Sequence, residues 1–430
     1  MNGRSGQNRA PHRRGHVGVF TFPAYAHIAP ALPTLAELVR RGHRVTCCVA
    51  ERFADMVRAV GADPVVYEST FPWAAGPTGS ALEGMLHFFE EGHAPLRAAV
   101  AAFADDRPDV LAHDLAASES ARLLARSWDI PVVQMCCTIA SSPKFSMTER
   151  QAREAPEPPP GEETIDAAHP AITRFVASRD RLLAECGLTD VSIDGFGAEH
   201  GDNIVFLPKE FQIAPETFDD RFAFIGPCPE AVAEPAPGTG WSPPASGRPV
   251  LLLSLGSSYT PDQGAFLRSC VAALADSPWH VVTTLSHRVR PEELGPLPPN
   301  VEAHQWLRHP EVLRHAAAFV THSGMGSVME ALAFGVPMVL VPYHIEQRVI
   351  AARATELDLG RVLHREAITP TALRTAVHEV STSPRIHAAV ATMRRHVHEA
   401  GGAARGADVV ESLLRTGPAT HPPTTRDLRK

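Results

Sequence analysis

The stretch Val320-Thr-His-Ser-Gly-Met-Gly-Ser327, which continues as Val-Met-Glu330-Ala-Leu-Ala-Phe-Gly-Val-Pro337, decides the fold. The apolar run 317–321 predicts a buried strand, and it ends in a loop with two glycines. Apolar residues at helical spacing follow, so the pattern predicts a helix over 326–334. A strand that leads through a glycine-rich turn into a helix is suited to bind an anion, because backbone N–H groups and the positive end of the helix dipole point at the bound group.

The side chains of this stretch predict a site for a nucleotide diphosphate. Gly324 and Gly326 let the backbone approach a ligand closely, and His322 and Ser327 add donors. Glu330 lies about one turn into the helix, where its carboxylate can accept two neighbouring hydroxyls, as on a ribose. The stretch is neither a Walker A loop nor a GxGxxG fingerprint. In the alternative interpretation, the glycines only form a tight turn and the histidine is an ordinary loop residue.

Composition indicates an ordinary globular chain of two domains. It has 430 residues, 44% of them hydrophobic and 20% charged, and its length is typical of two domains. A formal net charge of -8 argues against a nucleic-acid partner. No apolar run reaches membrane-spanning length, and the basic, polar N-terminus lacks the apolar core of a secretory signal. We therefore expect a cytoplasmic monomer or homodimer.

Cysteine and histidine spacing predicts no metal site. The seven cysteines include the adjacent pairs 47–48 and 136–137 and lack zinc-ligand spacing. They are typical of small buried apolar side chains in a reducing compartment. The 22 histidines are scattered and form no metal-ligand motif.

Strands and helices alternate twice along the chain, which predicts an α/β fold with two Rossmann-like, doubly wound domains that face each other across a cleft. Dense Pro, Gly and Ala mark a linker, and residues 150–170 have the composition of a mobile surface loop. The expected division is a disordered tail 1–16, a first domain 17–225, a linker 226–248, a second domain 249–397, a C-terminal helix 398–415 that crosses back to the first domain, and a disordered tail 416–430.

Two residues at the ends of predicted strands suit acid–base chemistry. His27 follows the first strand near the start of a helix, whose N-terminus would keep the imidazole neutral. Asp114 ends another strand of the same sheet. If these strands are adjacent, the carboxylate can bond one ring nitrogen and fix the tautomer, and such a pair suits deprotonation of a substrate hydroxyl. The alternative is a helix-start histidine and a helix-capping aspartate with no shared role.

Several ordered blocks of the chain resemble one family. They are FPAYAHIAP (22–30), ADDRPDVLAHD (104–114), SWDIPVVQ (127–134), GRPVLLLSLGSS (247–258), PPNVEAHQW (298–306) and FVTHSGMGSVMEALAFGVPMVLVP (319–342), followed by Glu346-Gln347. The chain is similar to GT-B nucleotide-sugar glycosyltransferases of the UDP-glycosyltransferase superfamily, and within it to bacterial macrolide glycosyltransferases. The similarity runs from about residue 17 to residue 415.

The resemblance implies an acceptor-binding first domain and a donor-binding second domain. His27 would be the general base and Asp114 its partner. The reaction would be inverting, by direct displacement at the anomeric carbon, with no metal and no cofactor besides the UDP- or TDP-linked sugar. The implied donor-binding residues are Ser257 at the diphosphate, Trp306 near the base, His322, Gly324, Gly326 and Ser327 at the phosphates, Glu330 at the ribose, and Glu346 and Gln347 at the sugar.

The chain departs from the family pattern at three places. Leu307-Arg308-His309 stands where the family usually has Val/Ala-Pro-Gln, Ile350 where it has Asn, and His322-Ser323 where it has His-Gly. The first two departures are compatible with a thymidine nucleotide or a deoxysugar donor, and also with no effect. A core position for Trp306 is the alternative to a place in the site.

Apolar residues of the first domain are candidates for the acceptor pocket, with an ordinary core position for about half of them as the alternative. They are Phe71, Trp73, Met85, Phe88, Phe89, Met135, Phe145 and Met147. We therefore expect transfer of a hexose, with UDP-glucose favoured, to a hydroxyl of a macrolide or other polyketide, for resistance or for biosynthesis. The alternatives are a TDP-deoxysugar transferase of antibiotic assembly and a non-catalytic nucleotide-sugar-binding relative. A sugar-nucleotide epimerase is disfavoured because its cleft acids are missing.

Overall fold

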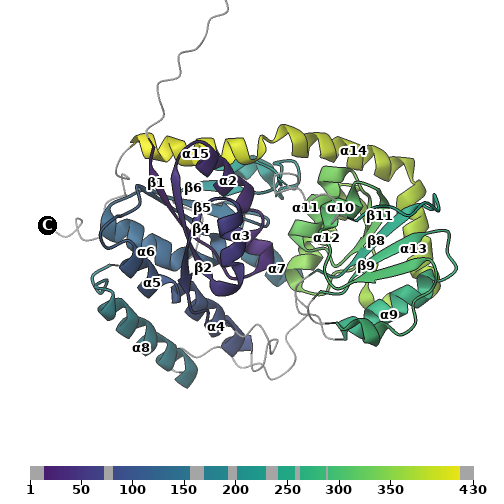
Figure 1. The fold of residues 1–430 in the computed structure, drawn as a ribbon, viewed down its shortest axis with the longest axis horizontal. Coiled ribbons are helices and arrows are strands. Elements are labelled where there is room, and N and C mark those ends of the chain that lie inside the picture. The colour runs from purple at the N-terminus through teal and green to yellow at the C-terminus, as the bar shows by residue number, and fades with distance from the viewer. Residues whose placement is uncertain are drawn as a thin grey trace, which may run out of the picture.

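Two parallel sheets, each covered by helices on both faces, make up the computed structural model (Figure 1). The structure describes residues 14–71, 81–154, 169–191, 201–228, 241–256, 262–286 and 289–416. The first sheet has the strand order β3-β2-β1-β4-β5-β6-β7, and the second has the order β10-β9-β8-β11-β12-β13. The predicted α/β class with two doubly wound domains is therefore confirmed.

The strands are short and mostly buried. The first sheet contains β1 (His16–Phe20), β2 (Arg44–Ala50), β3 (Asp63–Tyr67), β4 (Val110–Asp114), β5 (Val132–Cys136), β6 (Asp202–Val205) and β7 (Phe222–Phe224). The second contains β8 (Val250–Ser254), β9 (His280–Thr284), β10 (Val301–His304), β11 (Ala316–Thr321), β12 (Met338–Leu340) and β13 (Gly360–Val362).

The helices connect successive strands and cover both faces of each sheet. Those of the first half are α1 (Tyr25–Ile28), α2 (Leu32–Arg40), α3 (Ala54–Ala59), α4 (Ala81–His93), α5 (Leu96–Ala102), α6 (Ser118–Trp128), α7 (Met147–Glu154) and α8 (Pro170–Glu185). Those of the second half are α9 (Gln263–Leu274), α10 (His309–Leu313), α11 (Met325–Phe334), α12 (Ile345–Glu356), α13 (Pro370–Thr382), α14 (Pro384–Glu399) and α15 (Gly402–Thr416).

Each sheet reverses its strand order at one point, and both candidate sites lie there. In the first sheet β1 is the neighbour of both β2 and β4, and Phe20 pairs with His113. In the second sheet β8 is the neighbour of β9 and β11, and Thr321 pairs with Ser254. Ligands of doubly wound sheets bind beyond the carboxyl ends of the strands at such reversals, so the topology places the loops after β1, β4, β8 and β11 at the expected sites.

Four elements differ from the sequence prediction. Strands β7 and β13 were not predicted, because a three-residue segment at a sheet edge carries too little periodicity. The sequence pattern predicts one helical region over roughly 81–104, and the structure interrupts it before Pro95, which lacks the backbone N–H that a continuous helix needs. The sequence pattern likewise predicts a helix near 384–414, and the structure divides it at Gly401, whose φ of 101° is accessible to glycine and costly for other residues.

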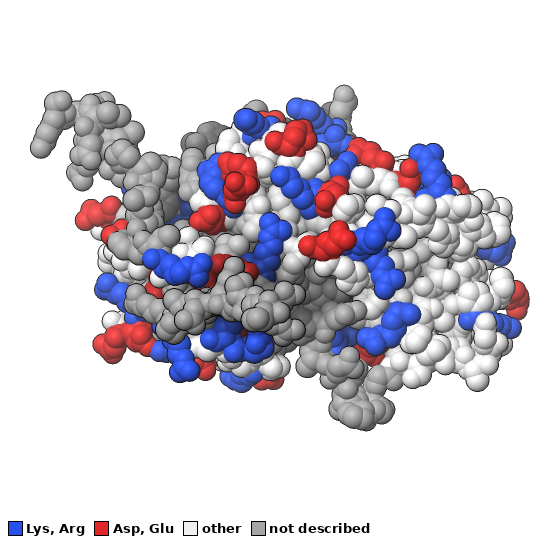
Figure 2. All heavy atoms as spheres, turned by 90° about the horizontal axis from the view of Figure 1, so that it is seen from above, with Lys and Arg blue, Asp and Glu red and all other residues white. Residues whose placement is uncertain are grey.

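Helix α15 leaves the second half of the chain and packs on α2 of the first sheet (Figure 1). Arg41 at the end of α2 donates hydrogen bonds to Asp408 (2.6 Å) and Glu411 (3.1 Å), and His43 lies 3.1 Å from Glu411. Figure 2, which looks onto this edge of the molecule, shows acidic and basic side chains next to one another. Ion pairs and apolar packing thus attach helix α15 to the first domain.

Several expected boundaries differ from the observed elements. Strand β1 already begins at His16, inside the expected tail, because the His16 N–H donates to Asp109 (2.8 Å) and its ring bonds Thr46 (2.8 Å). Helix α7 extends to Glu154, within the expected loop 150–170. Residues 1–13, 155–168, 229–240 and 417–430, which include most of the expected tails, loop and linker, lie outside the described residues. None of the described helices has the length and apolar character that a membrane crossing needs.

Candidate active site

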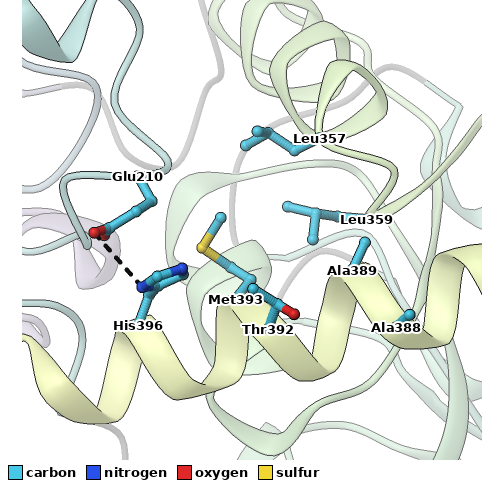
Figure 3. A pocket seen from close by; sticks show the side chains of 8 residues that line it. All are labelled: Glu210, Leu357, Leu359, Ala388, Ala389, Thr392, Met393 and His396. Atoms are coloured by element: carbon cyan, nitrogen blue, oxygen red, sulfur yellow. Dashed lines mark ion pairs between the residues drawn. The ribbon is translucent and has the colours of Figure 1, made fainter.

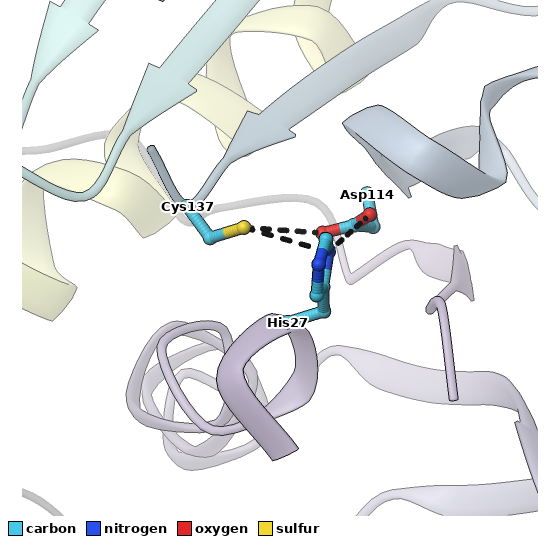
Figure 4. Close-up of side chains that lie close together, drawn as sticks. All are labelled: His27, Asp114 and Cys137. Atoms are coloured by element: carbon cyan, nitrogen blue, oxygen red, sulfur yellow. Dashed lines mark hydrogen bonds and ion pairs between the residues drawn. The ribbon is translucent and has the colours of Figure 1, made fainter. Parts of the chain in front are cut away.

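His27 and Asp114 form a hydrogen-bonded pair at the reversal point of the first sheet (Figure 4). The Nδ1 atom of His27 lies 2.9 Å from Oδ1 and 3.1 Å from Oδ2 of Asp114. Because an ionised carboxylate only accepts, the proton must sit on Nδ1, which leaves Nε2 with a lone pair. The carboxylate is 3% exposed and the histidine ring 25% exposed, so the ring is the part of the pair that solvent or a substrate reaches.

The chain positions both partners through local backbone structure. Asp114 ends β4 and caps the following turn by accepting the N–H of Ala116 (2.8 Å), so it is a cap and a partner of His27 at once. His27 lies in the single turn of α1, between β1 and α2. The two interpretations of the sequence are therefore not exclusive for Asp114.

The electrostatics of His27 differ from the sequence expectation. His27 is the third residue of the four-residue helix α1 and does not lie at the N-terminus of a longer helix, so no helix dipole keeps its ring neutral. Burial alone lowers the pKa of His27, but the charge and hydrogen bond of Asp114 outweigh it and hold the pKa well above 6.5.

Cys137, directly after β5, brings a sulfur to the same pair. Its Sγ lies 3.5 Å from Nδ1 of His27 and 3.8 Å from Oδ2 of Asp114. Burial raises the pKa of this thiol, which the charge of His27 partly offsets. No pattern in the sequence predicts this proximity, since Cys137 lies 110 residues from His27 and 23 residues from Asp114 in the chain.

The predicted anion loop begins helix α11 at the reversal point of the second sheet. Gly324 is its N-cap residue, and the first backbone N–H groups of a helix have no partner within the helix. A Cβ on Gly326 would meet nothing within 4 Å, so the backbone there is open to a ligand, and Ser327 follows in the first turn.

The first glycine of the loop, Gly324, has a role that differs from the expected one. A Cβ on Gly324 would lie 2.4 Å from Nε2 of His322, and a Cβ on Gly256 would lie 2.3 Å from Cε1 of the same ring. These two glycines therefore make room for the imidazole of His322. Burial lowers the pKa of this histidine to about 3, with smaller effects from His309 and His344, so the ring is neutral.

Ser323, which stands where the family pattern has glycine, adopts a φ of 68°. This left-handed conformation costs a residue with a Cβ roughly 1–2 kcal/mol. The geometry explains the preference of the family pattern for glycine at this position.

Glu330 is held by His309, one of the departures from the family pattern. Nδ1 of His309 lies 3.0 Å from Oε2 of Glu330, and Nε2 lies 3.0 Å from Oγ of Ser254. The hydroxyl of Thr284 donates in turn to Ser254 (2.6 Å). This chain of hydrogen bonds orients the carboxylate that was predicted to bind a ribose, and it makes His309 part of the site.

Trp306 is 43% exposed, so the alternative of a core position is wrong. Its ring meets that of Tyr25 edge to face, with centroids 5.1 Å apart. Burial and the charge of Glu330 raise the pKa of Tyr25 to about 12. The first domain thus contacts the expected nucleotide site through Tyr25.

The predicted sugar-binding pair also lies between the domains. Glu346 accepts a hydrogen bond from the hydroxyl of Thr138, which follows β5 in the first domain. Oε1 of Gln347 accepts the N–H groups of Tyr343 (2.8 Å) and His344 (3.1 Å) and so caps α12. Glu346 therefore lies near the dyad loops, whereas the carbonyl of Gln347 is used to begin a helix.

Three other residues singled out in the sequence are the donor candidate Ser257, the acceptor candidate Trp73 and the departure Ile350. Ser257 and Trp73 lie outside the described residues. Ile350 is fully buried in the core of the second domain, so the departure at this position concerns packing.

The predicted acceptor residues divide into two groups. Phe71 and Phe88 both pack on Phe22, at centroid distances of 5.3 and 4.9 Å, and Phe22 lies 5.1 Å from the ring of His27. Phe89 contacts Phe88 (6.3 Å), and Met85, on the same helix, is exposed. Phe22, Phe71 and Phe88 thus form an apolar surface beside the dyad.

The other predicted acceptor residues lie in or against the hydrophobic core. Met135 is 2% exposed and Met147 is 6% exposed, and both lie in hydrophobic clusters. Phe145 packs on Phe218 at 6.3 Å. Met135 on β5 and Met147 at the start of α7 therefore take the core positions that the sequence left open as the alternative, whereas Phe145 is only partly buried and stays a candidate for the acceptor pocket.

A pocket of about 400 Å³ lies elsewhere, where α14 meets the end of α12 (Figure 3). His396 and Glu210 form an ion pair at its edge, 3.5 Å apart. None of the described site residues lines it, so it is separate from the dyad and from the anion loop.

The chain and its fold are similar to several known proteins. The family model for UDP-glucoronosyl and UDP-glucosyl transferase matches residues 197–399. The chain is 37% identical to the demethyllactenocin mycarosyltransferase of Streptomyces fradiae, over 94% of this chain and 87% of that protein. It is 35% identical to the oleandomycin glycosyltransferase of Streptomyces antibioticus, over 94% and 92%. The crystal structure of CalG4, the calicheamicin glycosyltransferase, is similar with a TM-score of 0.77 and 38% identity, over 94% of this chain and 98% of that one.

Proposed function

Because this chain belongs to the UDP-glucoronosyl and UDP-glucosyl transferase family and has the GT-B fold, we propose that it transfers a hexose from a nucleotide sugar, with UDP-glucose favoured, to a hydroxyl of a macrolide or other polyketide. That the chain is a glycosyltransferase follows from its relatives. The observation that carries the proposal is the His27–Asp114 pair, whose exposed ring lies beside the apolar surface of Phe22, Phe71 and Phe88.

The proposed mechanism is a single displacement that needs no metal. Nε2 of His27 accepts the proton of the acceptor hydroxyl while Nδ1–H stays bonded to Asp114, which stabilises the imidazolium that forms. The oxygen attacks the anomeric carbon from the side opposite the diphosphate, so the configuration inverts. The bond from carbon to the diphosphate oxygen breaks with both electrons on the leaving group.

The leaving group would be stabilised by the second domain. The first N–H groups of α11 and the positive end of its dipole face the expected phosphate position, and the neutral His322 ring adds a donor. Glu330, oriented by His309, would hold the ribose, and Trp306 would lie beside the base. Glu346 would bind sugar hydroxyls after exchanging its bond with Thr138.

A thymidine-linked deoxysugar is the second candidate donor. The observations that favour it are His309 in place of the usual glutamine and the similarity to a protein named as a mycarosyltransferase. The acceptor class is proposed from the same relatives, one of which is named for oleandomycin.

Calorimetric binding of UDP and TDP, each free and as the glucose conjugate, tests the donor. A preference for UDP, followed by mass-spectrometric detection of a hexosylated macrolide with inverted anomeric configuration, supports the first proposal. A preference for TDP supports the second candidate, transfer of a thymidine-linked deoxysugar. Absence of binding by both nucleotides contradicts both proposals and favours a relative without transferase activity.

A further inference from the structure

Three potential metal ligands meet at the dyad. His27 follows β1, Asp114 ends β4 and Cys137 follows β5, and their side chains point toward one another (Figure 4). Within the described ranges, this is the one group of His, Cys, Asp and Glu side chains whose ligand atoms converge in this way. The residues are far apart in sequence, which is why spacing in the chain predicts no metal site.

The distances in this group resemble the edges of a coordination tetrahedron. With metal–ligand lengths of about 2.0–2.3 Å, neighbouring N, O and S ligands of a tetrahedral zinc ion lie roughly 3.3–3.6 Å apart. The observed separations are 3.5 Å from Nδ1 to Sγ, 3.8 Å from Sγ to Oδ2 and 3.1 Å from Nδ1 to the same Oδ2. The first edge fits, whereas the second is longer and the third shorter than this range by about 0.2 Å. Shifts of a few tenths of an ångström would therefore complete the triangle, and metal bonds would then replace the hydrogen bond.

We propose that His27, Asp114 and Cys137 form a binding site for a divalent transition metal ion such as Zn²⁺, and that its occupation blocks the enzyme. The ligand set of one nitrogen, one oxygen and one sulfur suits a borderline-soft ion and not Mg²⁺ or Ca²⁺, which prefer oxygen alone. The 25% exposure of the His27 side chain gives the ion a route and leaves a fourth position for water.

Metal binding at Nδ1 would reverse the tautomer of His27. In the metal-free pair the proton lies on Nδ1 and Nε2 accepts. A metal on Nδ1 needs the lone pair of that atom, so the proton moves to Nε2, and the thiol proton of Cys137 is released to solvent as the thiolate binds. The ring then has no site that accepts a proton. This consequence rests on the proposed role of His27 as the base, whereas the metal site itself does not.

Cobalt(II) titration of the full-length protein without substrates tests the site directly. A tetrahedral Co²⁺–thiolate site gives visible d–d bands and a sulfur-to-metal charge-transfer band in the near ultraviolet. The native protein and the control Cys186→Ser, altered at a half-buried thiol at the end of α8, should show both bands. Cys137→Ser should lose the charge-transfer band and bind at least about 10-fold more weakly.

A second variant protects this test against a folding defect. Asp114→Asn keeps the thiol and the shape of the side chain, and it should retain the charge-transfer band with weaker affinity. An unchanged band and affinity in a folded Cys137→Ser protein, or no band in the native protein, would overturn the metal site.

Inhibition kinetics test the consequence for activity. Zn²⁺ should inhibit transfer in competition with the acceptor and not with the nucleotide sugar, EDTA should reverse it, and Cys137→Ser should need at least about 10-fold more Zn²⁺ relative to its own metal-free rate. Equal Zn²⁺ sensitivity of Cys137→Ser and Cys186→Ser would overturn the inhibition. The cobalt bands do not depend on catalytic turnover. If the protein shows the bands but has no transferase activity, the proposed function is contradicted and the metal site is supported.

Discussion

Nδ1 of His27 lies 2.9 Å from Oδ1 of Asp114, although 87 residues separate the two in the chain. The bond exists because β1 and β4 are neighbours at the reversal point of the first sheet, and each residue follows or ends one of these strands. Its geometry fixes which nitrogen of the ring can accept a proton, and the first two predictions depend on it.

Replacing Asp114 by asparagine should reduce kcat by about 100- to 10,000-fold, the usual range for loss of acid–base assistance. Asparagine can still cap Ala116, so the protein should remain folded, with a melting curve close to that of the native chain. Steady-state kinetics and circular dichroism measure both quantities. A folded variant with full activity would reduce Asp114 to a helix cap.

The pH profile of kcat/KM should have an acid limb whose midpoint lies above pH 6.5. Asp114 raises the pKa of His27, so the inactive imidazolium persists to higher pH and activity rises as the ring loses its proton. In Asp114→Asn the negative charge is gone, and the midpoint should move to lower pH. If it stays in place, a group other than His27 controls the limb.

His309→Ala should weaken nucleotide binding about 10-fold, because the Glu330 carboxylate loses a hydrogen-bond donor, and a hydrogen bond to a charged group is worth about 1.5 kcal/mol or more. His309→Gln, which can still donate to the carboxylate, is the matched control and should recover most of the affinity. Calorimetry with UDP and TDP, together with the KM for the acceptor, separates this effect from a general loss of structure. An equal loss in both variants would mean that Glu330 does not depend on this bond.

Ser323→Gly should be more stable than Ser323→Ala by about 1 kcal/mol, since only glycine adopts a φ of 68° without strain. Both substitutions remove the hydroxyl, so their difference isolates the backbone. Urea denaturation of the two variants gives the free energies of unfolding. Equal values would show that the loop relaxes out of the left-handed region.

Treatment with EDTA should leave the transfer rate unchanged, or raise it if trace metal occupies the dyad. The proposed mechanism uses the N-terminus of α11 and His322 at the diphosphate, where other enzymes use a cation. Activity after treatment and after addition of Mg²⁺ is the measurement. Loss of activity that Mg²⁺ restores contradicts a metal-free reaction.

The parts of the fold that depend on local pattern could be predicted from sequence. Continuous apolar runs predicted the buried strands, and glycine, proline and polar residues marked most helix ends. Both sites lie at strand ends, so a strand assignment with a doubly wound topology was enough to bring His27 near Asp114. The three-residue strands β7 and β13 could not be found, because their formation depends on neighbouring strands.

Relationships across the two domains could not be predicted in the same way. The bond between Thr138 and Glu346 and the contact of Tyr25 with Trp306 depend on how two separately folded sheets meet. Likewise, Met135 and Phe88 are both apolar, and the sequence alone does not distinguish a core position from a site position for them. Met135 is buried because its position on β5 directs its side chain into the core. The role of His309 could not be predicted either, because it depends on two partners that are distant in the chain. Ser254 bonds one ring nitrogen and Glu330 bonds the other.

The return of α15 to the first domain sets a rule for building hybrid enzymes. A chimera that combines the acceptor half of this protein with the donor half of a relative is usually joined at the linker alone. Here the last helix packs on α2, and Arg41 pairs with Asp408 and Glu411. A second junction near Gly401 is therefore needed, so that residues 402–416 come from the same parent as the acceptor half.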